Sequence, residues 1–134
     1  MAAVDSPKPL KDLATQLSRP TTWNGQRVRG LNLLGEDAAL LQAVGRGEFL
    51  INGLRNRDLQ ALLFDSPATG DDDPRQQRRR SGQVTRKLRM LRAHGLLKKV
   101  SHTHRYMVSN KGRQVITALI AAREADIAKL TRAA

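Results

Sequence analysis

The sequence predicts a mainly α-helical domain that contains one small β-hairpin. Apolar residues recur at helical spacing in several separate segments, and two short β-forming runs sit between strong helix signals near the carboxyl end. Hydrophobic residues make up 40% of the 134 residues and aromatic residues only 3%. We therefore expect one domain with a modest core of aliphatic side chains, preceded by an arm.

The first 35 residues are expected to form this arm. A short helix is expected over residues 8–18, because Pro20 ends it and four apolar side chains share one face. So short a helix is marginal alone and must pack on the domain, on a second copy or on a segment outside this sequence. Residues 23–25 predict a turn and residues 26–34 an extended stretch. The apolar anchors of the arm are Leu10, Leu13, Ala14, Leu17, Val28, Leu31 and Leu33.

The main domain, residues 36–134, is expected to begin with a helix from Glu36 to Val44. Residues 48–51 form a short apolar run of β-forming residues and are expected to be a strand. A second helix is expected over residues 56–64, with Asn56 as its cap. The side chains of these two helices that are expected to face the core are Leu40, Leu41, Val44, Leu59, Leu62 and Leu63.

A third helix is expected from about residue 74 to residue 94. Three aspartates followed by Pro74 form a start signal, since carboxylates and proline are both favourable at a helix amino end. Three consecutive carboxylates diverge, so we expect no metal ion there. Gly95 is expected to stop the helix. Gly82 inside it costs about 1 kcal/mol relative to Ala and predicts either a bend or a late start after Ser81.

Two strands are expected after Gly95, over residues 96–100 and 105–108, joined by a tight turn. A long helix then covers about residues 110–130 and spans roughly 30 Å. This length exceeds what a small core needs, so we expect a homodimer or a larger complex formed through residues 8–18 and 110–130. The apolar side of the long helix comprises Val115, Ile116, Leu119, Ile120, Ile127 and Leu130.

The net charge of +12 is concentrated in one segment. Residues 74–123 contain fourteen Lys or Arg and no Asp or Glu, whereas the remainder has a net charge of −2. A clustered cationic field of this kind suits a polyanion. The alternative, a solvated basic face without a ligand, accounts less well for the segregation of charge.

Helical spacing also sorts the side chains of the third helix onto two faces. Val84, Leu88 and Leu91 fall on one side, and the arginines fall on the other. Gly82 lies among the arginines and, without a side chain, lets a backbone approach the helix closely. Arg and Gln can read guanine and adenine in bidentate fashion, so the base-reading candidates are Arg79, Gln83 and Arg86. The expected phosphate contacts of this helix are Arg75, Arg78, Arg80, Lys87, Arg89 and Arg92.

The short hairpin adds further candidate phosphate contacts beside the third helix. Its basic residues bracket a turn rich in hydrogen-bonding side chains, which suits the nucleic-acid backbone or the minor groove. The candidates are Lys98, Lys99, His102, Thr103, His104 and Arg105. A metal site built from the two turn histidines and His94 is not expected, because no carboxylate lies nearby in the sequence. In the arm, Arg27 and Arg29 can touch phosphate or solvate the chain, and we favour solvation.

The segment from Val84 to Leu97, followed by the hairpin and by Val108-Ser109-Asn110-Lys111-Gly112-Arg113, resembles winged-helix regulators of the MarR and ArsR kind. This resemblance covers about residues 36–130. It implies a recognition helix at about 74–94, a wing at about 96–108 and a final helix. Two features depart from the pattern, namely the nine-residue acidic loop over residues 65–73 and the short wing turn. The chain also resembles the carboxy-terminal part of longer uncharacterised bacterial proteins.

These observations predict a double-stranded DNA-binding protein, acting as a transcriptional regulator or as an accessory of a mobile or defence element. The alternatives are an RNA or ribonucleoprotein component and a winged-helix subunit that binds protein. Scarce aromatics favour duplex over single strands, since single-strand binders stack bases on aromatic rings. No catalytic residues can be named, so we expect no enzyme and no cofactor.

The composition also bears on where the protein acts. The chain has no cysteine, which excludes a disulfide scaffold, a thiol nucleophile and a cysteine-ligated zinc site. No apolar run approaches the ~18 residues of a membrane span, and the first 20 residues lack the apolar core of a secretion signal. We therefore expect a cytoplasmic, nucleoid-associated protein without a membrane partner.

Overall fold

The computed structural model describes residues 10–64 and 74–133, with side chains described up to Ala125. The protein is 61% helical, and two small antiparallel sheets complete the fold, so the prediction of a mainly α-helical protein with a small hairpin is confirmed. The elements in chain order are α1 (Leu10–Leu17), β1 (Thr21–Trp23), β2 (Gln26–Val28), α2 (Ala38–Val44), α3 (Gly47–Asn52), β3 (Leu54–Arg55), α4 (Asn56–Leu63), α5 (Pro74–Ala93), β4 (Leu97–Lys99), β5 (Arg105–Val108) and α6 (Asn110–Ala133).

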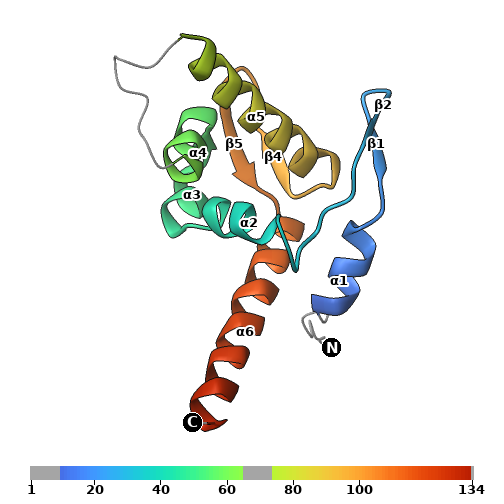
Figure 1. Ribbon diagram of the computed structural model, residues 1–134. Coiled ribbons are helices and arrows are strands. Elements are labelled where there is room, and N and C mark those ends of the chain that lie inside the picture. The colour runs from blue at the N-terminus through green and yellow to red at the C-terminus, as the bar shows by residue number, and fades with distance from the viewer. Residues whose placement is uncertain (1–9, 65–73, 134) are drawn as a thin grey trace.

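The larger sheet has the strand order β3-β5-β4. Its central strand β5 pairs through Tyr106 with Leu54 of β3 on one side and with Lys99 of β4 on the other. The expected hairpin over residues 96–108 is therefore present, and it gains a third strand from a distant segment. In Figure 1, α5 lies across this sheet, and α6 extends away from the body on the side opposite the amino end of α5.

The arm forms its own hairpin, β1–β2. Asn24 and Gly25 both have positive φ, 50° and 78°, which matches the tight two-residue turn that the Asn-Gly pair favours. The predicted turn is confirmed, whereas the extended stretch predicted from residue 26 begins as the second strand of this hairpin. Figure 1 shows the hairpin beside the carboxyl end of α5.

One aliphatic cluster joins the arm to the rest of the protein. Leu13 and Leu17 of α1 are 3% and 2% exposed, and Leu31 and Leu33 after β2 are equally buried. All four belong to the same buried cluster as Leu59 of α4, Leu88 of α5 and Val115 of α6. The helix α1 packs on α6, so the arm completes the core of this chain.

The expected strand over residues 48–51 is wrong, because these residues belong to the short helix α3. Gly53, with φ of 80°, then reverses the chain, and the edge of β5 is occupied by Leu54 and Arg55 instead. The short helix buries Phe49 while leaving Ile51 76% exposed. The guanidinium of Arg113 donates to the carbonyl of Leu50 at 2.7 Å and so satisfies one free acceptor at the end of α3.

Smaller expectations also need correction. The first helix of the main domain begins at Ala38 and not at Glu36. Asn56 is not the cap of α4, since Arg55 takes that position and its backbone N–H donates to Asp58 at 2.8 Å. Two side chains expected to face the core are partly exposed, Leu62 at 39% and Ile120 at 45%. The aspartates expected to cap α5 lie outside the described residues.

A buried carboxylate fixes the arm to the start of α2. Asp37 is 1% exposed and accepts two hydrogen bonds from the guanidinium of Arg29, both 3.0 Å, and one from the backbone N–H of Asn32 at 2.7 Å. Burial alone raises the pKa of the Asp37 carboxyl. The hydrogen bonds from Arg29 and Asn32 outweigh burial, so this pKa lies below its ordinary value.

We expect Asp37→Asn to lower the free energy of unfolding by about 2–3 kcal/mol at pH 7, because three hydrogen bonds to a buried charge are weakened. Since the folded-state pKa of Asp37 is depressed, its stabilisation is present above about pH 4 and is lost as pH falls through the folded-state value. Urea unfolding between pH 7 and pH 2 measures this difference.

The matched control is Glu36→Gln, since Glu36 lies 3.7 Å from Arg29 but its side chain is 72% exposed. It should change stability by less than about 0.5 kcal/mol. A gap between wild type and Asp37→Asn that does not narrow in acid would contradict the assigned role of the carboxylate.

Candidate nucleic-acid interface

The helix α5 has one buried side and one basic side. Val84, Leu88 and Leu91 are 0%, 2% and 0% exposed, which confirms the predicted buried side. The helix is continuous from Pro74 through Gly82 to Ala93, so the expected alternative of a late start after Ser81 is wrong. The opposite side, here called the outer face, comprises Arg75, Arg78, Arg79, Gly82, Gln83, Arg86 and Arg89.

The three base-reading candidates lie together on the outer face. Arg79, Gln83 and Arg86 are all exposed. Gln83 borders two shallow hollows on the surface, one shared with Arg79 and one of about 240 Å³ shared with Arg86. Arg78, Arg79 and Arg86 form no ion pair with any residue in the described part of the chain. Their charges are thus available to an anionic ligand.

The middle of α5 is held by α4. The amide of Asn56 donates to the carbonyl of Ser81 at 3.1 Å and to the hydroxyl of Thr85 at 3.0 Å. Gln60, one turn later on α4, donates to the side-chain oxygen of Asn56 at 2.5 Å and orients it. This cross-link fixes the rotation of α5 about its axis, which determines where the outer face points. Asn56 is a positioning residue that the sequence signal suggested only as a cap.

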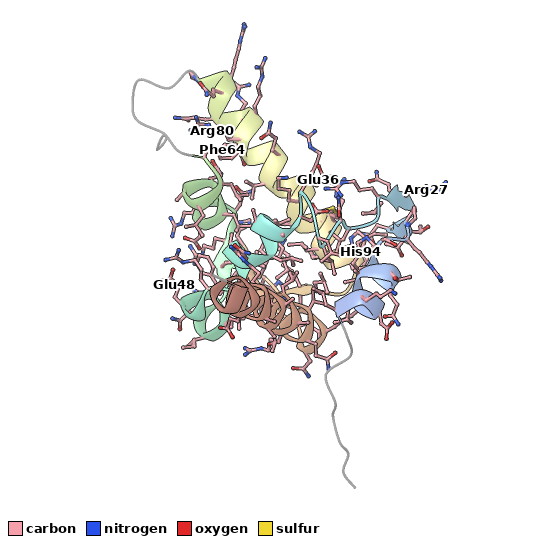
Figure 2. All side chains as sticks on the ribbon, turned by 60° about the horizontal axis from the view of Figure 1, so that its bottom comes forward. Arg27, Glu36, Glu48, Phe64, Arg80 and His94 are labelled. Atoms are coloured by element: carbon pink, nitrogen blue, oxygen red, sulfur yellow. The ribbon has the colours of Figure 1, made fainter. Side chains whose placement is uncertain are left out.

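Arg80 is held against Phe64, the residue that follows the carboxyl end of α4. Its guanidinium lies 5.1 Å from the centroid of the Phe64 ring, a distance typical of a cation–π contact. Figure 2 shows the two labelled side chains next to each other where α4 ends. Arg80, expected to contact phosphate, is therefore turned toward the protein more than its neighbours Arg78 and Arg79 are.

The arm hairpin engages the carboxyl end of α5. The guanidinium of Arg92 lies 5.3 Å from the ring of Trp23 and 5.9 Å from the ring of Tyr106, so it links the arm to strand β5. Arg89 donates to the side-chain oxygen of Gln26 at 3.2 Å. Both arginines were expected to contact phosphate, and both also have protein partners. Within the described residues, these contacts of the arm thus fall at the carboxyl end of α5, and Arg78, Arg79 and Arg86 stay exposed.

The arm arginines are placed differently from one another. Arg27 pairs with Thr22 on the hairpin face opposite Trp23 and Gln26, which contact α5. Figure 2 shows Arg27 at the outer edge of the molecule, away from α5. Arg29 binds Asp37 and also borders the hollow beside Gln83 and Arg86. Neither position was distinguishable from the spacing of basic residues alone.

The β4–β5 hairpin presents its basic residues to solvent. Lys98, Lys99 and Arg105 are exposed, as are His102 and His104 in the turn. The hydroxyl of Thr103 donates to the carbonyl of Val100 at 2.8 Å and accepts the N–H of Arg105 at 3.1 Å. Thr103, predicted as a phosphate contact, therefore also shapes the turn.

The three histidines do not form one site. His94 is 7% exposed, and its Nε2 lies 2.8 Å from the carbonyl of Arg29, whereas His102 and His104 lie at the hairpin turn. Within the described ranges, no three His, Cys, Asp or Glu residues are grouped so as to hold a metal ion. The role of His94 that the structure supports is to fasten the arm to the end of α5.

Among the described helices, none is long and apolar enough to cross a membrane. Models of protein families, curated proteins and solved structures were compared with this chain, and none of them matches it. The interpretation of the outer face therefore depends on its own geometry and charge.

We expect Arg92→Gln to loosen the arm hairpin, because the neutral amide loses the attraction of two aromatic rings. The emission of Trp23, the single tryptophan, should shift to longer wavelength, and stability should fall by about 1 kcal/mol. Arg86→Gln, earlier on the same helix, serves as the control and should leave the emission unchanged. Equal spectra for wild type and Arg92→Gln would mean that the hairpin does not depend on this contact.

Proposed function

We propose that this protein binds double-stranded DNA through a winged-helix domain, with α5 as the recognition helix and β4–β5 as the wing. The observation that carries the proposal is the outer face of α5, where exposed Arg78, Arg79, Gln83 and Arg86 lie opposite a fully buried side. A rigid helix with uncompensated arginines on one face suits the major groove of a duplex.

The order of the elements supports the winged-helix assignment. The order expected for a winged helix is a helix, a short strand, two helices, two strands and a final helix. The elements α2, β3, α4, α5, β4, β5 and α6 follow this order, and the short helix α3 is an addition between α2 and β3. The strand order β3-β5-β4 places the first strand beside the last one, so the three strands form a single sheet behind α5. This arrangement brings the basic hairpin next to the helix that would enter the groove.

The state of the aromatic side chains favours a duplex over a single strand. All four aromatic residues lie in the described part of the chain, and none is fully exposed, since three of them are half-buried and one is buried. Phe49 is buried, Phe64 is covered by Arg80, and Trp23 and Tyr106 flank Arg92. Because sequence-tolerant binding of single strands relies on free aromatic faces, this surface is better suited to phosphates and groove edges.

The proposal extends to the setting in which the protein acts. A DNA-binding domain of this size would act at the nucleoid in the cytoplasm, as a transcriptional regulator or as an accessory of a mobile or defence element. We also propose that two copies associate through α6, whose Ile120 is 45% exposed although it belongs to the apolar side of the helix. A dimer would double the number of phosphate contacts and read a symmetric site.

Binding to duplex DNA should weaken steeply as salt rises. With about six phosphate contacts, the logarithm of the binding constant should fall against the logarithm of salt concentration with a slope of about −5 or steeper. Fluorescence anisotropy with a labelled duplex, and with single-stranded DNA and duplex RNA as competitors, measures the slope and the ligand class. A salt-insensitive interaction, or stronger competition by RNA than by DNA, would contradict the proposal.

Base reading and phosphate contact should separate in two single variants. Arg86→Ala is expected to lower the preference for a selected site over random DNA by ~5- to 150-fold, since one bidentate contact is worth about 1–3 kcal/mol. Lys99→Ala, on the wing, should weaken selected and random duplexes alike and reduce the salt slope by about 1. If both variants affected selected and random DNA equally, the division of roles between α5 and the wing would be wrong.

A further inference from the structure

Most glycines in the described part of the chain have a visible structural reason. Gly25, Gly53 and Gly95 have positive φ, a conformation that other residues rarely adopt. At Gly30, Gly35, Gly45 and Gly112, a Cβ atom would come closer to another atom than real Cβ atoms do. Two glycines remain, Gly47 and Gly82, and at each of them an added Cβ would meet no described atom within 4 Å.

Gly82 is the more unusual of the two because it lies in the interior of a 20-residue helix. A glycine there lowers helix stability relative to alanine, and neither its φ nor its surroundings require the missing side chain. Gly47, in contrast, is the first residue of the short helix α3, where the penalty is smaller. Nothing inside the described fold therefore offsets the instability that Gly82 introduces.

The position of Gly82 on α5 is central to the outer face. Arg78 and Arg79 lie one turn before it and Arg86 lies one turn after it on the same side. The adjacent residue Ser81 is held from behind by Asn56 of α4, so the backbone at this point is fixed against the core. The backbone at Gly82 is thus partly exposed, carries no side chain, is surrounded by arginines and is held in a fixed position at the surface.

We infer that Gly82 is the point of closest approach between α5 and the DNA, and that its missing side chain lets the helix backbone sit against the base edges. The inference rests on the proposed function. The long side chains of the arginines around Gly82 can move aside and bind the duplex when the helix backbone comes close to it. A side chain at residue 82 would instead hold the whole helix away from the duplex. Gly82 is then a residue that determines the depth at which α5 enters the groove.

The test exploits the opposite signs expected for stability and binding. Gly82→Ala should raise the melting temperature by about 3–5 °C, because alanine favours the helix, and should weaken binding to the selected duplex at least tenfold. Gly82→Leu should weaken binding further. The control variants Gly47→Ala and Gly47→Leu are equally open in the structure but lie off the outer face, and their affinities should stay within twofold of wild type.

The experiment can overturn the inference about Gly82 in three ways. A Gly82→Ala variant that is more stable and binds DNA as wild type does would overturn the inference and leave the proposed function standing. A Gly82→Ala variant that is less stable than wild type would overturn it too, since the residue would then have a structural reason. A wild-type protein that binds no duplex DNA would overturn the inference together with the proposed function.

Discussion

The rest of the structure depends on the way in which α5 ends. Gly95, with φ of 79°, lets the N–H of Leu96 return to the carbonyl of Leu91 at 2.9 Å, which closes the helix and turns the chain into β4. Two further hydrogen bonds form at the same junction. The Nε2 atom of His94 lies 2.8 Å from the carbonyl of Arg29, and the hydroxyl of Ser109 donates to the carbonyl of Gly95 at 2.5 Å. Arm, hairpin and α6 are therefore all fastened at one point. Displacement of this junction would change the orientation of the outer face and of the β4–β5 hairpin together.

The second constraint is electrostatic. Arginines gathered on one face of a helix keep a strong positive field only where they are not neutralised by nearby carboxylates. Among the described residues, the ion pairs of Arg29 with Glu36 and Asp37 and of Arg46 with Glu48 lie off α5. Arg89 and Arg92 instead contact neutral partners, namely the side-chain oxygen of Gln26 and the ring of Trp23 in the arm and the ring of Tyr106 in β5. Such contacts order the side chains and leave their charge intact. The surface stays cationic and is held in a defined geometry.

Periodicity and strong local signals were enough to predict part of the fold from the sequence. The two faces of α5, its start at Pro74, its end before Gly95 and the Asn24-Gly25 turn are all present, because each depends on residues close in the chain. The strand predicted for residues 48–51 was wrong because β propensity depends on an available partner strand, and β5 is paired with residues 54–55 instead. Asn56, Trp23 and Gln26 could not be recognised as supports of α5, since their partners on that helix lie 25 or more residues away. The candidate base-reading residues were predicted together on one face, but the arm that covers the end of that face was not.

The outer face of α5 is tested most directly by a map of the protein's backbone amide signals, by nuclear magnetic resonance, during titration with a selected duplex. We expect the largest shifts between Arg78 and Arg86 on α5 and between Lys98 and Arg105 of the β4–β5 hairpin, with α3 and the exposed side of α6 unaffected. Shifts centred on α3 or α6, or no shifts at a duplex concentration that saturates binding, would contradict the claim that the outer face of α5 is the interface.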